Sequence, residues 1–545
     1  MTRGARSYPA VDCRRPYRRP PNALLASVVF ISGCTTTTGA EFTNDLFDKY
    51  EVVTGTTPRQ TVVPGFFLGG ATAELAVVYT DENDIRRLQM YGLDGGAWST
   101  VLEAELSPTV LFVDVANIGG HDRLITYEDG RINWFNPASA ADRVLLEIAT
   151  NYTTTYPSEI PHLDITRDVN HDGRDDLVVP DVDGFWISTQ RSDGSFSGPL
   201  KPGPPEPFLD EIAFGDTRSY GQMGITAQTN PSYQSRVHEV DCNQDGRSDL
   251  LFWNEDHFEV HYQDALGSFD PVAETFTTEV PFDSEGVYSF GYGFSDASNF
   301  SLFTGLGPKN KRTVLHSFSD MNGDGVVDLV TQSLQGRSLL RLRSRYEAYF
   351  GLPTADGISF DPSVGMDLHP QGRAKGGSPL GYSLGDWQDL DGDGQIEFMF
   401  GRVDTGVGGF FRAIVVNSIA IDLEYYRIEN GIYPEQPNGS LRIKPDFDFV
   451  IGGRGPFFPT VLVGEVNGDH HADLLVGENW DELHVYLGVP GPDVFARRPQ
   501  TVAVALSANE QNTRLVDLNQ DDKQDVLIHH PSTTEPHRLM VLIAR

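Results

Sequence analysis

The sequence predicts an all-β fold made of many short antiparallel strands, and three observations support this prediction. The 545 residues include 55 glycines and 34 prolines, which are scattered along the chain as turn residues rather than gathered in one tail. Few stretches show the periodicity of a long amphipathic helix. An acidic loop followed by a short apolar segment also recurs at intervals of about 50 to 80 residues, enough chain for a four-stranded sheet.

Composition excludes several classes of partner and site. The formal net charge is −36 at pH 7, so nucleic acid would be repelled and is not an expected partner. The three cysteines, Cys13, Cys34 and Cys242, lie far apart, so neither a disulfide framework nor a cysteine metal site is expected. The chain contains no His-Glu-x-x-His, Gly-x-Ser-x-Gly, Cys-x-x-Cys or phosphate-binding loop motif. No catalytic residue is therefore assigned.

The N-terminal segment is typical of an export signal. Six arginines precede residue 20, and the apolar run 23–31 that follows is too short to span a bilayer. The sequence Ile31-Ser32-Gly33-Cys34 resembles the lipobox of bacterial lipoproteins, in which the cysteine is lipidated. We therefore predict a lipoprotein-type signal peptide at 1–33, lipidation of Cys34, and a flexible tether at 34–48. The predicted location is the cell envelope or surface through a lipid anchor; the alternative is a secreted or periplasmic protein.

Six loops repeat one pattern. Counted from the first acid, each has Asn or Asp at position 3, Asp at position 5, usually Gly at position 6 and an acid at position 9, followed by an apolar run. The residues at positions 1, 3, 5, 7 and 9 are Asp168, Asn170, Asp172, Arg174 and Asp176; Asp241, Asn243, Asp245, Arg247 and Asp249; Asp320, Asn322, Asp324, Val326 and Asp328; Asp389, Asp391, Asp393, Gln395 and Glu397; Glu465, Asn467, Asp469, His471 and Asp473; and Asp517, Asn519, Asp521, Lys523 and Asp525.

This spacing is typical of a Ca²⁺ site, because Ca²⁺ takes about six to eight oxygen ligands at roughly 2.3–2.6 Å. Side chains at positions 1, 3, 5 and 9 supply oxygens, and position 7 supplies its backbone carbonyl. Glycine at position 6 permits a positive φ; His470 and Asp522 stand there in two loops. An EF-hand is excluded, since it needs a glutamate at position 12 and flanking helices. We expect about four to six Ca²⁺ ions.

The loops and the Asp-Leu-Val-type strands after them resemble the FG-GAP/VCBS repeats of integrin-α-like β-propellers over residues 60–545. The family's glycine signatures are partly present, as in 67–71 and 383–386. This resemblance implies one propeller domain at 49–545 with four-stranded antiparallel blades and calcium loops within the blades. In such propellers the calcium loops lie on the face opposite the ligand site.

Eight blades are favoured over seven. Two degenerate units precede the six loops, one near residue 70 and one at Asp114–Leu124. The last unit, from Arg514, has room for about three strands, and we predict that the segment Tyr50–Val53 supplies the fourth.

The longer stretches at 276–313 and 403–458 are predicted insertions, where repeat proteins often carry binding loops; the alternative is longer strands and core packing. The function predicted is a non-enzymatic binding or adhesion module for a protein or glycan. One alternative is a calcium-dependent carbohydrate-active enzyme such as a polysaccharide lyase. Another is a subunit of a larger surface or secretion assembly.

Overall fold

The computed structural model describes residues 46–128, 130–139, 141–148, 160–181, 184–203, 237–282, 284–285, 310–336, 343–354, 357–368, 389–393, 397–403, 417–418, 420–427, 433–434, 436–446, 460–491, 493–508, 512–532 and 535–545. These residues form strands and turns and contain no α-helix. Accordingly, the described part of the chain holds no helix of the length and hydropathy needed to cross a membrane. The predicted signal peptide, Cys34 and residues 34–45 of the predicted tether lie outside it.

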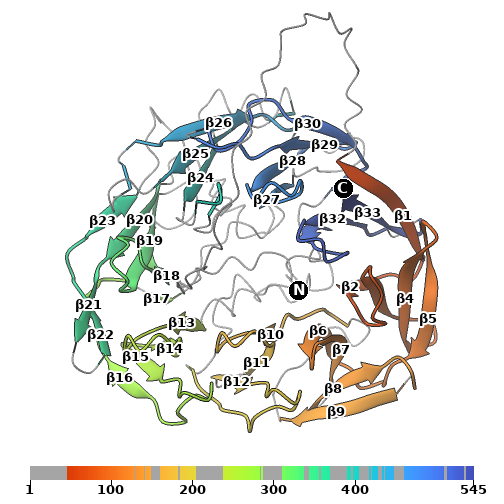
Figure 1. The fold of residues 1–545 in the computed structure, drawn as a ribbon, viewed down its shortest axis with the longest axis horizontal. Helices are drawn as coiled ribbons and strands as arrows, with labels where there is room; N and C mark the ends of the chain where they lie inside the picture. Colours follow the sequence, from red (N-terminus) through yellow and green to blue (C-terminus); the bar gives the residue numbers. More distant parts are fainter. Residues whose placement is uncertain are drawn as a thin grey trace, which may run out of the picture.

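The sheets form a ring of eight blades, which confirms the predicted propeller and its favoured blade number (Figure 1). Blade 1 contains β2 (Thr61–Gly65), β3 (Glu74–Thr80), β4 (Arg86–Asp94) and β5 (Ala97–Glu105). Blade 2 contains β6 (Phe112–Ile118), β7 (His121–Glu128), β8 (Arg131–Asn136) and β9 (Ala141–Glu147). Blade 3 contains β10 (Thr166–Arg167), β11 (Asp176–Asp181) and β12 (Gly184–Ser188). Blade 4 contains β13 (His238–Val240), β14 (Asp249–Asn254), β15 (His257–His261) and β16 (Glu274–Phe276).

The second half of the ring is less regular. Blade 5 contains β17 (Ser284–Glu285), β18 (Asn310–Ser319), β19 (Asp328–Gly336), β20 (Arg343–Tyr349) and β23 (Met366–Leu368), with a separate hairpin of β21 (Gly351–Thr354) and β22 (Gly357–Phe360). Blade 6 contains β24 (Phe398–Val403), β25 (Ile421–Tyr426) and β26 (Gly439–Ile443). Blade 7 contains β27 (Val461–Gly464), β28 (Asp473–Asn479), β29 (Glu482–Tyr486) and β30 (Gln500–Ala503). Blade 8 contains β31 (Thr513–Val516), β32 (Asp525–His530), β33 (His537–Ala544) and β1 (Phe47–Gly55).

Blade 8 closes the ring by combining both ends of the described chain. Strand β1 pairs antiparallel with β33, in a register that runs from Phe47 opposite Ala544 to Gly55 opposite His537 (Figure 1). The predicted segment Tyr50–Val53 lies inside β1, so the prediction that the N-terminal side supplies the missing strand is confirmed.

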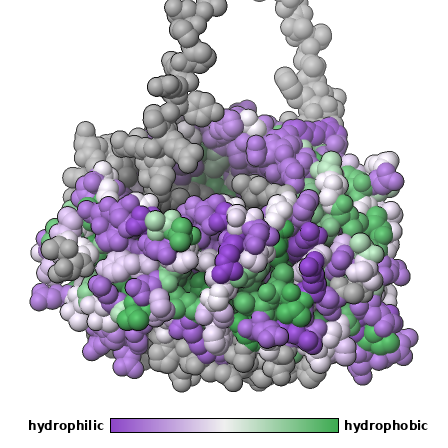
Figure 2. Space-filling view, turned by 60° about the horizontal axis from the view of Figure 1, so that its bottom comes forward, coloured by the Kyte–Doolittle hydropathy of each residue, from purple (hydrophilic) through white to green (hydrophobic). Residues whose placement is uncertain are grey.

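The hydrophobic core lies between neighbouring blades. The second strand of each blade is buried on both faces; Leu75–Val78 in β3 and Val526–Ile528 in β32 are fully buried. One apolar cluster joins Leu475 of blade 7 to Val526 of blade 8, and the other clusters join successive blades in the same way. At roughly 25 cal/mol per Å² of buried apolar surface, this contact between sheets is the main stabilising term. Hydrophilic residues predominate on the surface in the view of Figure 2.

The two predicted insertions are only partly described. At the start of 276–313, Phe276 stacks on Phe258 and Phe282 meets Trp253 edge-to-face, in the core shared by blades 4 and 5. Within 403–458, β25 and β26 are regular strands of blade 6. Residues 286–309, 404–416 and 447–458 lie outside the described residues.

Candidate metal centres

The six acidic loops occupy equivalent places in blades 3 to 8. Each precedes the second strand of its blade, and in five of them the described first strand leads into the loop. Loops of neighbouring blades are also hydrogen-bonded to one another: Ala472 N donates to Leu390 O at 2.9 Å, and Gln524 N donates to Glu465 O at 2.7 Å. The loops therefore gather on one face of the ring, around its centre.

Position 2 anchors every loop in the core. Its side chain is almost fully buried in all six loops, although the residue type varies. Its N–H donates to a carboxylate oxygen of the acid at position 9, at 2.8–3.2 Å. The six residues at position 2 are Val169, Cys242, Met321, Leu390, Val466 and Leu518.

The acid at position 9 is a buried structural staple as well as a candidate ligand. In five loops its second oxygen accepts an N–H bond of 2.7–2.9 Å from a residue at or just past the end of the blade's third strand. Those five donors are Gln190, Gln263, Gly351, Gly488 and Ala544. The predicted role, closure of the metal shell, did not include this function.

Burial raises the pKa of every acid at position 9, and the neighbouring acids of the same loop raise it further. The pKa is about 8 for Asp176, about 7 for Asp328, Glu397 and Asp525, and about 6 for Asp249 and Asp473. These carboxylates are thus costly to keep ionised without a compensating cation. A divalent ion beside them would reverse that effect.

The acid at position 1 is held by the loop's own backbone. Asp241 accepts the N–H of Asp245 at 3.1 Å and that of Gly246 at 2.8 Å, and Asp168 and Asp320 accept the same pair of bonds. Asparagine at position 3 and aspartate at position 5 accept further N–H bonds within the loop. In blade 4, Asn243 accepts the N–H of Asp245 and Asp245 accepts the N–H of Arg247. Each loop is therefore a fixed frame of side-chain oxygens.

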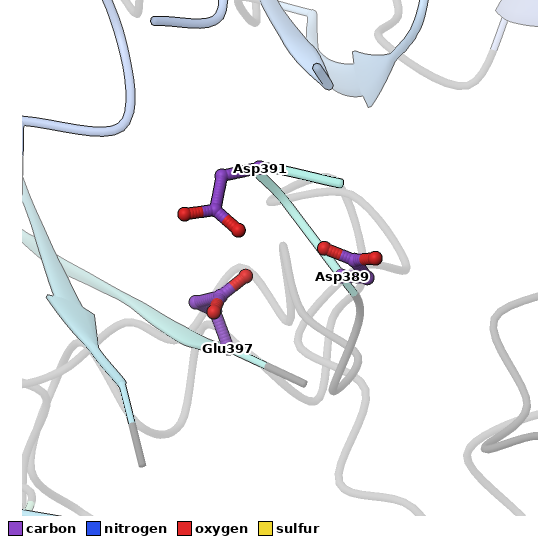
Figure 3. Close-up of side chains that lie close together, drawn as sticks. All are labelled: Asp389, Asp391 and Glu397. Carbon is purple, nitrogen blue, oxygen red and sulfur yellow. The ribbon is translucent and has the colours of Figure 1, made fainter. Parts of the chain in front are cut away.

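The loop of blade 6 shows the closest convergence of acids among the described residues. Oxygens of Asp389, Asp391 and Glu397 all lie within 4.8 Å of one another, and the three carboxylates face a common space (Figure 3). Two oxygens on one Ca²⁺ ion are at most about 5 Å apart, so this spacing fits a shared ion. Asp393 is described beside them, whereas Gln395 lies outside the described residues.

Positions 4 and 6 take left-handed backbone conformations in every loop in which both residues are described. Position 6 does so as predicted, including His470 at φ 67° and Asp522 at φ 66°. Position 4 also does so, for example at His171 with φ 57° and Gln244 with φ 59°, which the sequence analysis did not anticipate. Histidine and asparagine-like side chains tolerate this region better than most, so the loops do not depend on glycine at both positions.

The side chains at position 7, assigned only a carbonyl role by the sequence, carry contacts of their own. Arg174 and Arg247 each form an ion pair with the acid at position 5 of the same loop. Lys523 pairs with Asp521 at 3.0 Å, and His471 lies 3.4 Å from Asp469.

Blades 1 and 2 lack the oxygen frame, as predicted for the two degenerate units. In blade 1, Glu74 occupies position 9 and accepts the N–H of Leu68 at 3.0 Å, but Phe66 stands at position 1. In blade 2, β6 and β7 are joined by a tight turn at Gly119 and Gly120.

A pocket of about 330 Å³ lies where blades 8, 1, 2 and 3 meet on the loop face. Its lining combines apolar side chains, such as Phe66 and Val115, with the carboxylates of Asp122 and Asp175. Lysine and arginine are absent from the residues that line it. The sequence analysis placed candidate binding surfaces in the long insertions and did not find this pocket, because its residues come from four separate blades.

The sequence also missed the residues that connect loops to other strands. Gln263 of blade 4 donates to Asn170 O of blade 3 at 2.9 Å, and Arg427 at the end of β25 pairs with Asp391 at 2.5 Å. A repeated signal existed for the glutamines, since Gln190 and Gln263 both stand fourteen residues after the acid at position 9.

No protein-family model matches the chain, and no curated protein matches it. Three of the solved structures that match it are all 10% identical to it. The V. cholerae biofilm matrix protein Bap1 has a TM-score of 0.35, with 93% of this chain and 89% of that chain covered. The Bacillus licheniformis rhamnogalacturonan lyase PL11 has a TM-score of 0.29, with 92% and 76% covered. An engineered GH43 glycoside hydrolase with endo-xylanase and exo-arabinofuranosidase activity has a TM-score of 0.19, with 91% and 100% covered. These similarities are too weak to carry an argument about function, and the resemblance to FG-GAP/VCBS repeats stays a prediction.

Proposed function

We propose that this protein is an exported, calcium-stabilised β-propeller that acts as a non-enzymatic binding module for a protein or glycan. The observation that carries the calcium proposal is the repeated oxygen frame of the six loops. Each presents acids in the same register, joined by an asparagine oxygen in five of the loops, beside a buried carboxylate of raised pKa. Bound Ca²⁺ would supply the positive charge that these loops need.

The residues fit such an ion by type as well as by spacing. Carboxylate, amide and carbonyl oxygens are the ligands that Ca²⁺ prefers, and each loop offers five positions that carry them. The chain's own residues build the site: position 2 fixes the loop in the core, position 9 joins it to the third strand, and the backbone orients positions 1, 3 and 5. Neutralising the acids would rigidify the centre of the loop face.

The binding role follows from a rigid ring that presents surfaces to a partner. The pocket beside blades 1 and 2 is a candidate contact point, because it combines apolar walls with hydrogen-bonding groups. Its size suits one side chain or one sugar unit rather than a long ligand. The partner is identified here only as a protein or a glycan.

Calcium counting with thermal unfolding tests the first part of the proposal. We expect about four to six Ca²⁺ ions per chain and a Tm that falls by roughly 10 °C or more in excess EGTA. Mg²⁺ at the same concentration should restore little of the loss, because it prefers a smaller octahedral shell. A Tm that is indifferent to chelator, together with no bound metal, would contradict calcium binding.

A glycan array and a turnover assay test the second part. Binding without turnover on a panel of acidic polysaccharides is the expected result. Turnover that is lost on a single substitution outside the six loops would instead establish the enzymatic alternative. Co-purification of a fixed partner at constant stoichiometry would show that the chain is a subunit of a larger assembly.

We also propose that the protein is held in the cell envelope by lipid on Cys34. The support is the lipobox-like sequence that ends at this cysteine. Metabolic labelling with a fatty acid should mark the wild-type chain and leave Cys34→Ala unlabelled, with Cys242→Ala as the matched control. A labelled Cys34→Ala protein, or release of the wild type as a soluble species, would contradict the anchor and favour a secreted or periplasmic protein.

A further inference from the structure

Two loops share every candidate side-chain ligand but differ in charge at position 7. The Asp241 loop of blade 4 and the Asp320 loop of blade 5 share Asp, Asn, Asp, Gly and Asp at positions 1, 3, 5, 6 and 9. They share most of their internal hydrogen bonds, including the bond from the asparagine Nδ2 to the acid at position 5, at 3.1 Å and 3.0 Å, and the Asp320 loop adds a bond from Gly323 N to Asp320 at 2.7 Å. Position 7 is Arg247 in the first loop and Val326 in the second.

Arg247 connects the Asp241 loop to the chain that follows the third strand of blade 4. Its guanidinium pairs with the Asp245 carboxylate, and its Nε donates to Gln263 O at 3.0 Å. Gln263 in turn donates its own N–H to Asp249 at 2.9 Å. The acids at positions 5 and 9 are thereby joined through one arginine and one strand residue.

Blade 3 repeats this arrangement. Arg174 pairs with Asp172 and donates to Gln190 O at 3.0 Å, and Gln190 N donates to Asp176 at 2.7 Å. Lys523 of blade 8 supplies a shorter version, because it pairs with Asp521 only. Arg174, Arg247 and Lys523 thus each place a basic side chain on the acid at position 5 of their own loop.

The Asp320 loop has the same acids and no such side chain. Val326 packs into the apolar cluster of blades 4 and 5 and lies against Gly351. Gly351 N still donates to Asp328 at 2.8 Å, so the staple at position 9 is kept. Within the described residues, no lysine, arginine or histidine forms an ion pair with Asp320, Asp324 or Asp328.

We propose that the residue at position 7 sets how strongly each blade depends on calcium. Loops with arginine or lysine carry their own counter-cation and keep their shape when metal is absent. The Asp320 loop lacks one, so its like charges, a few ångströms apart, are relieved only by the ion. This inference rests on the proposed calcium binding. It also predicts that loops with arginine at position 7 bind Ca²⁺ more weakly than the Asp320 loop, because a guanidinium repels a nearby Ca²⁺ ion.

The remaining two loops fall between these extremes. In blade 6, Arg427 pairs with Asp391 at position 3. In blade 7, His471 at position 7 lies 3.4 Å from Asp469. Blade 5 is thus the blade that chelation should loosen first.

Hydrogen exchange of the full chain, with Ca²⁺ and with EGTA, tests the proposal. In the wild type we expect EGTA to accelerate exchange in β19 and the Asp320 loop far more than in β14 and the Asp241 loop. Val326→Arg should reduce the EGTA effect in blade 5, and Arg247→Val should increase it in blade 4. Arg247→Val should also bind calcium about two- to fivefold more tightly at that loop, the range of a partly exposed charge interaction.

Calcium counting on the same samples separates the two proposals. No bound calcium in the wild type would overturn both of them. Bound calcium with equal EGTA effects in blades 4 and 5, unchanged by Arg247→Val, would overturn this inference alone. Arg247→Met and Arg174→Val give the same test without introducing a charge, so the result does not depend on whether Val326→Arg folds.

Discussion

The connection between the first and second strands differs between blades 1 and 2 and blades 3 to 8. In blade 2 the chain reverses at once through Gly119 and Gly120, at φ 62° and 83°. Asp114 of this blade is buried and bonded to His162 at 2.9 Å and to Ile165 N at 2.9 Å. In blades 3 to 8 the carboxylate-rich loop makes the equivalent connection.

All eight sheets nevertheless stand in one ring, with the same burial between neighbours. The strand arrangement therefore does not require the aspartates. Blade 1 is the intermediate case, because Glu74 keeps the buried staple at position 9 while the other oxygens are gone. The comparison therefore separates two roles. The buried acid at position 9 stabilises the fold, whereas the other loop oxygens are needed only for the proposed ion.

The largest expected effect comes from removing a staple in an aspartate blade. Asp249 is fully buried and accepts N–H bonds from Cys242 at 3.0 Å and Gln263 at 2.9 Å. Asp249→Ala leaves both donors without a partner and should lower the free energy of unfolding by about 3 kcal/mol. Urea unfolding with and without Ca²⁺ should show most of this loss in both conditions. A loss seen only with Ca²⁺ would mean that position 9 serves the ion alone.

Removing the acid at position 9 of blade 1 should lower the free energy of unfolding by less, and the effect should not depend on Ca²⁺. Glu74→Ala loses the bond to Leu68 N and should destabilise the chain by about 2 kcal/mol, equally in Ca²⁺ and in EGTA. Glu82→Ala, an exposed acid of the same blade, is the matched control and should change little. A chelator-dependent effect of Glu74→Ala would break the distinction between the two groups of blades.

Low pH should destabilise blade 8 through a histidine at the end of the blade opposite its acidic loop. His529 lies at the far end of β32, and burial, with the nearby His537 and His530, lowers its pKa to about 3. Between pH 6.5 and this value the unfolded chain binds a proton that the folded chain does not, so stability falls as pH falls. At pH 5.5 the loss should be about 1 kcal/mol relative to pH 7, measured as the difference between wild type and His529→Gln. An equal pH response in both proteins would contradict it.

The smallest effect on the fold should come from a candidate ligand that is not a staple. Asp324→Asn keeps an acceptor for the Val326 N–H bond of 2.8 Å and should change the stability of the chelated protein by less than about 0.5 kcal/mol. It should nevertheless remove or weaken one calcium site, measured by native mass spectrometry or calorimetric titration. Unchanged calcium binding would show that the side chain at position 5 is not a ligand.

The sequence predicts the fold well because each blade repeats a local pattern. The loop spacing, the apolar second strands and the short last unit lead directly to eight blades and to the closing strand near Tyr50. The arrangement of the sites is less predictable, because it depends on partners from other strands. Gln263 and Asn170 are 93 residues apart, and nothing within either loop indicates their bond. The buried anchor at position 2 was visible in the sequence, since Val, Cys, Met and Leu all stand there, but its role appears only in the packed sheet.

The closing sheet also determines when the ring can be completed as the chain is synthesised. Contacts between β1 and β33 join residues 483 to 497 positions apart, so they can form only after the rest of the described ring has been synthesised. Until then β1 has no partner on that side and presents a free strand edge, which other chains can pair with. We therefore expect substitutions that weaken the pairing of β1 with β33 to promote aggregation as well as to lower stability.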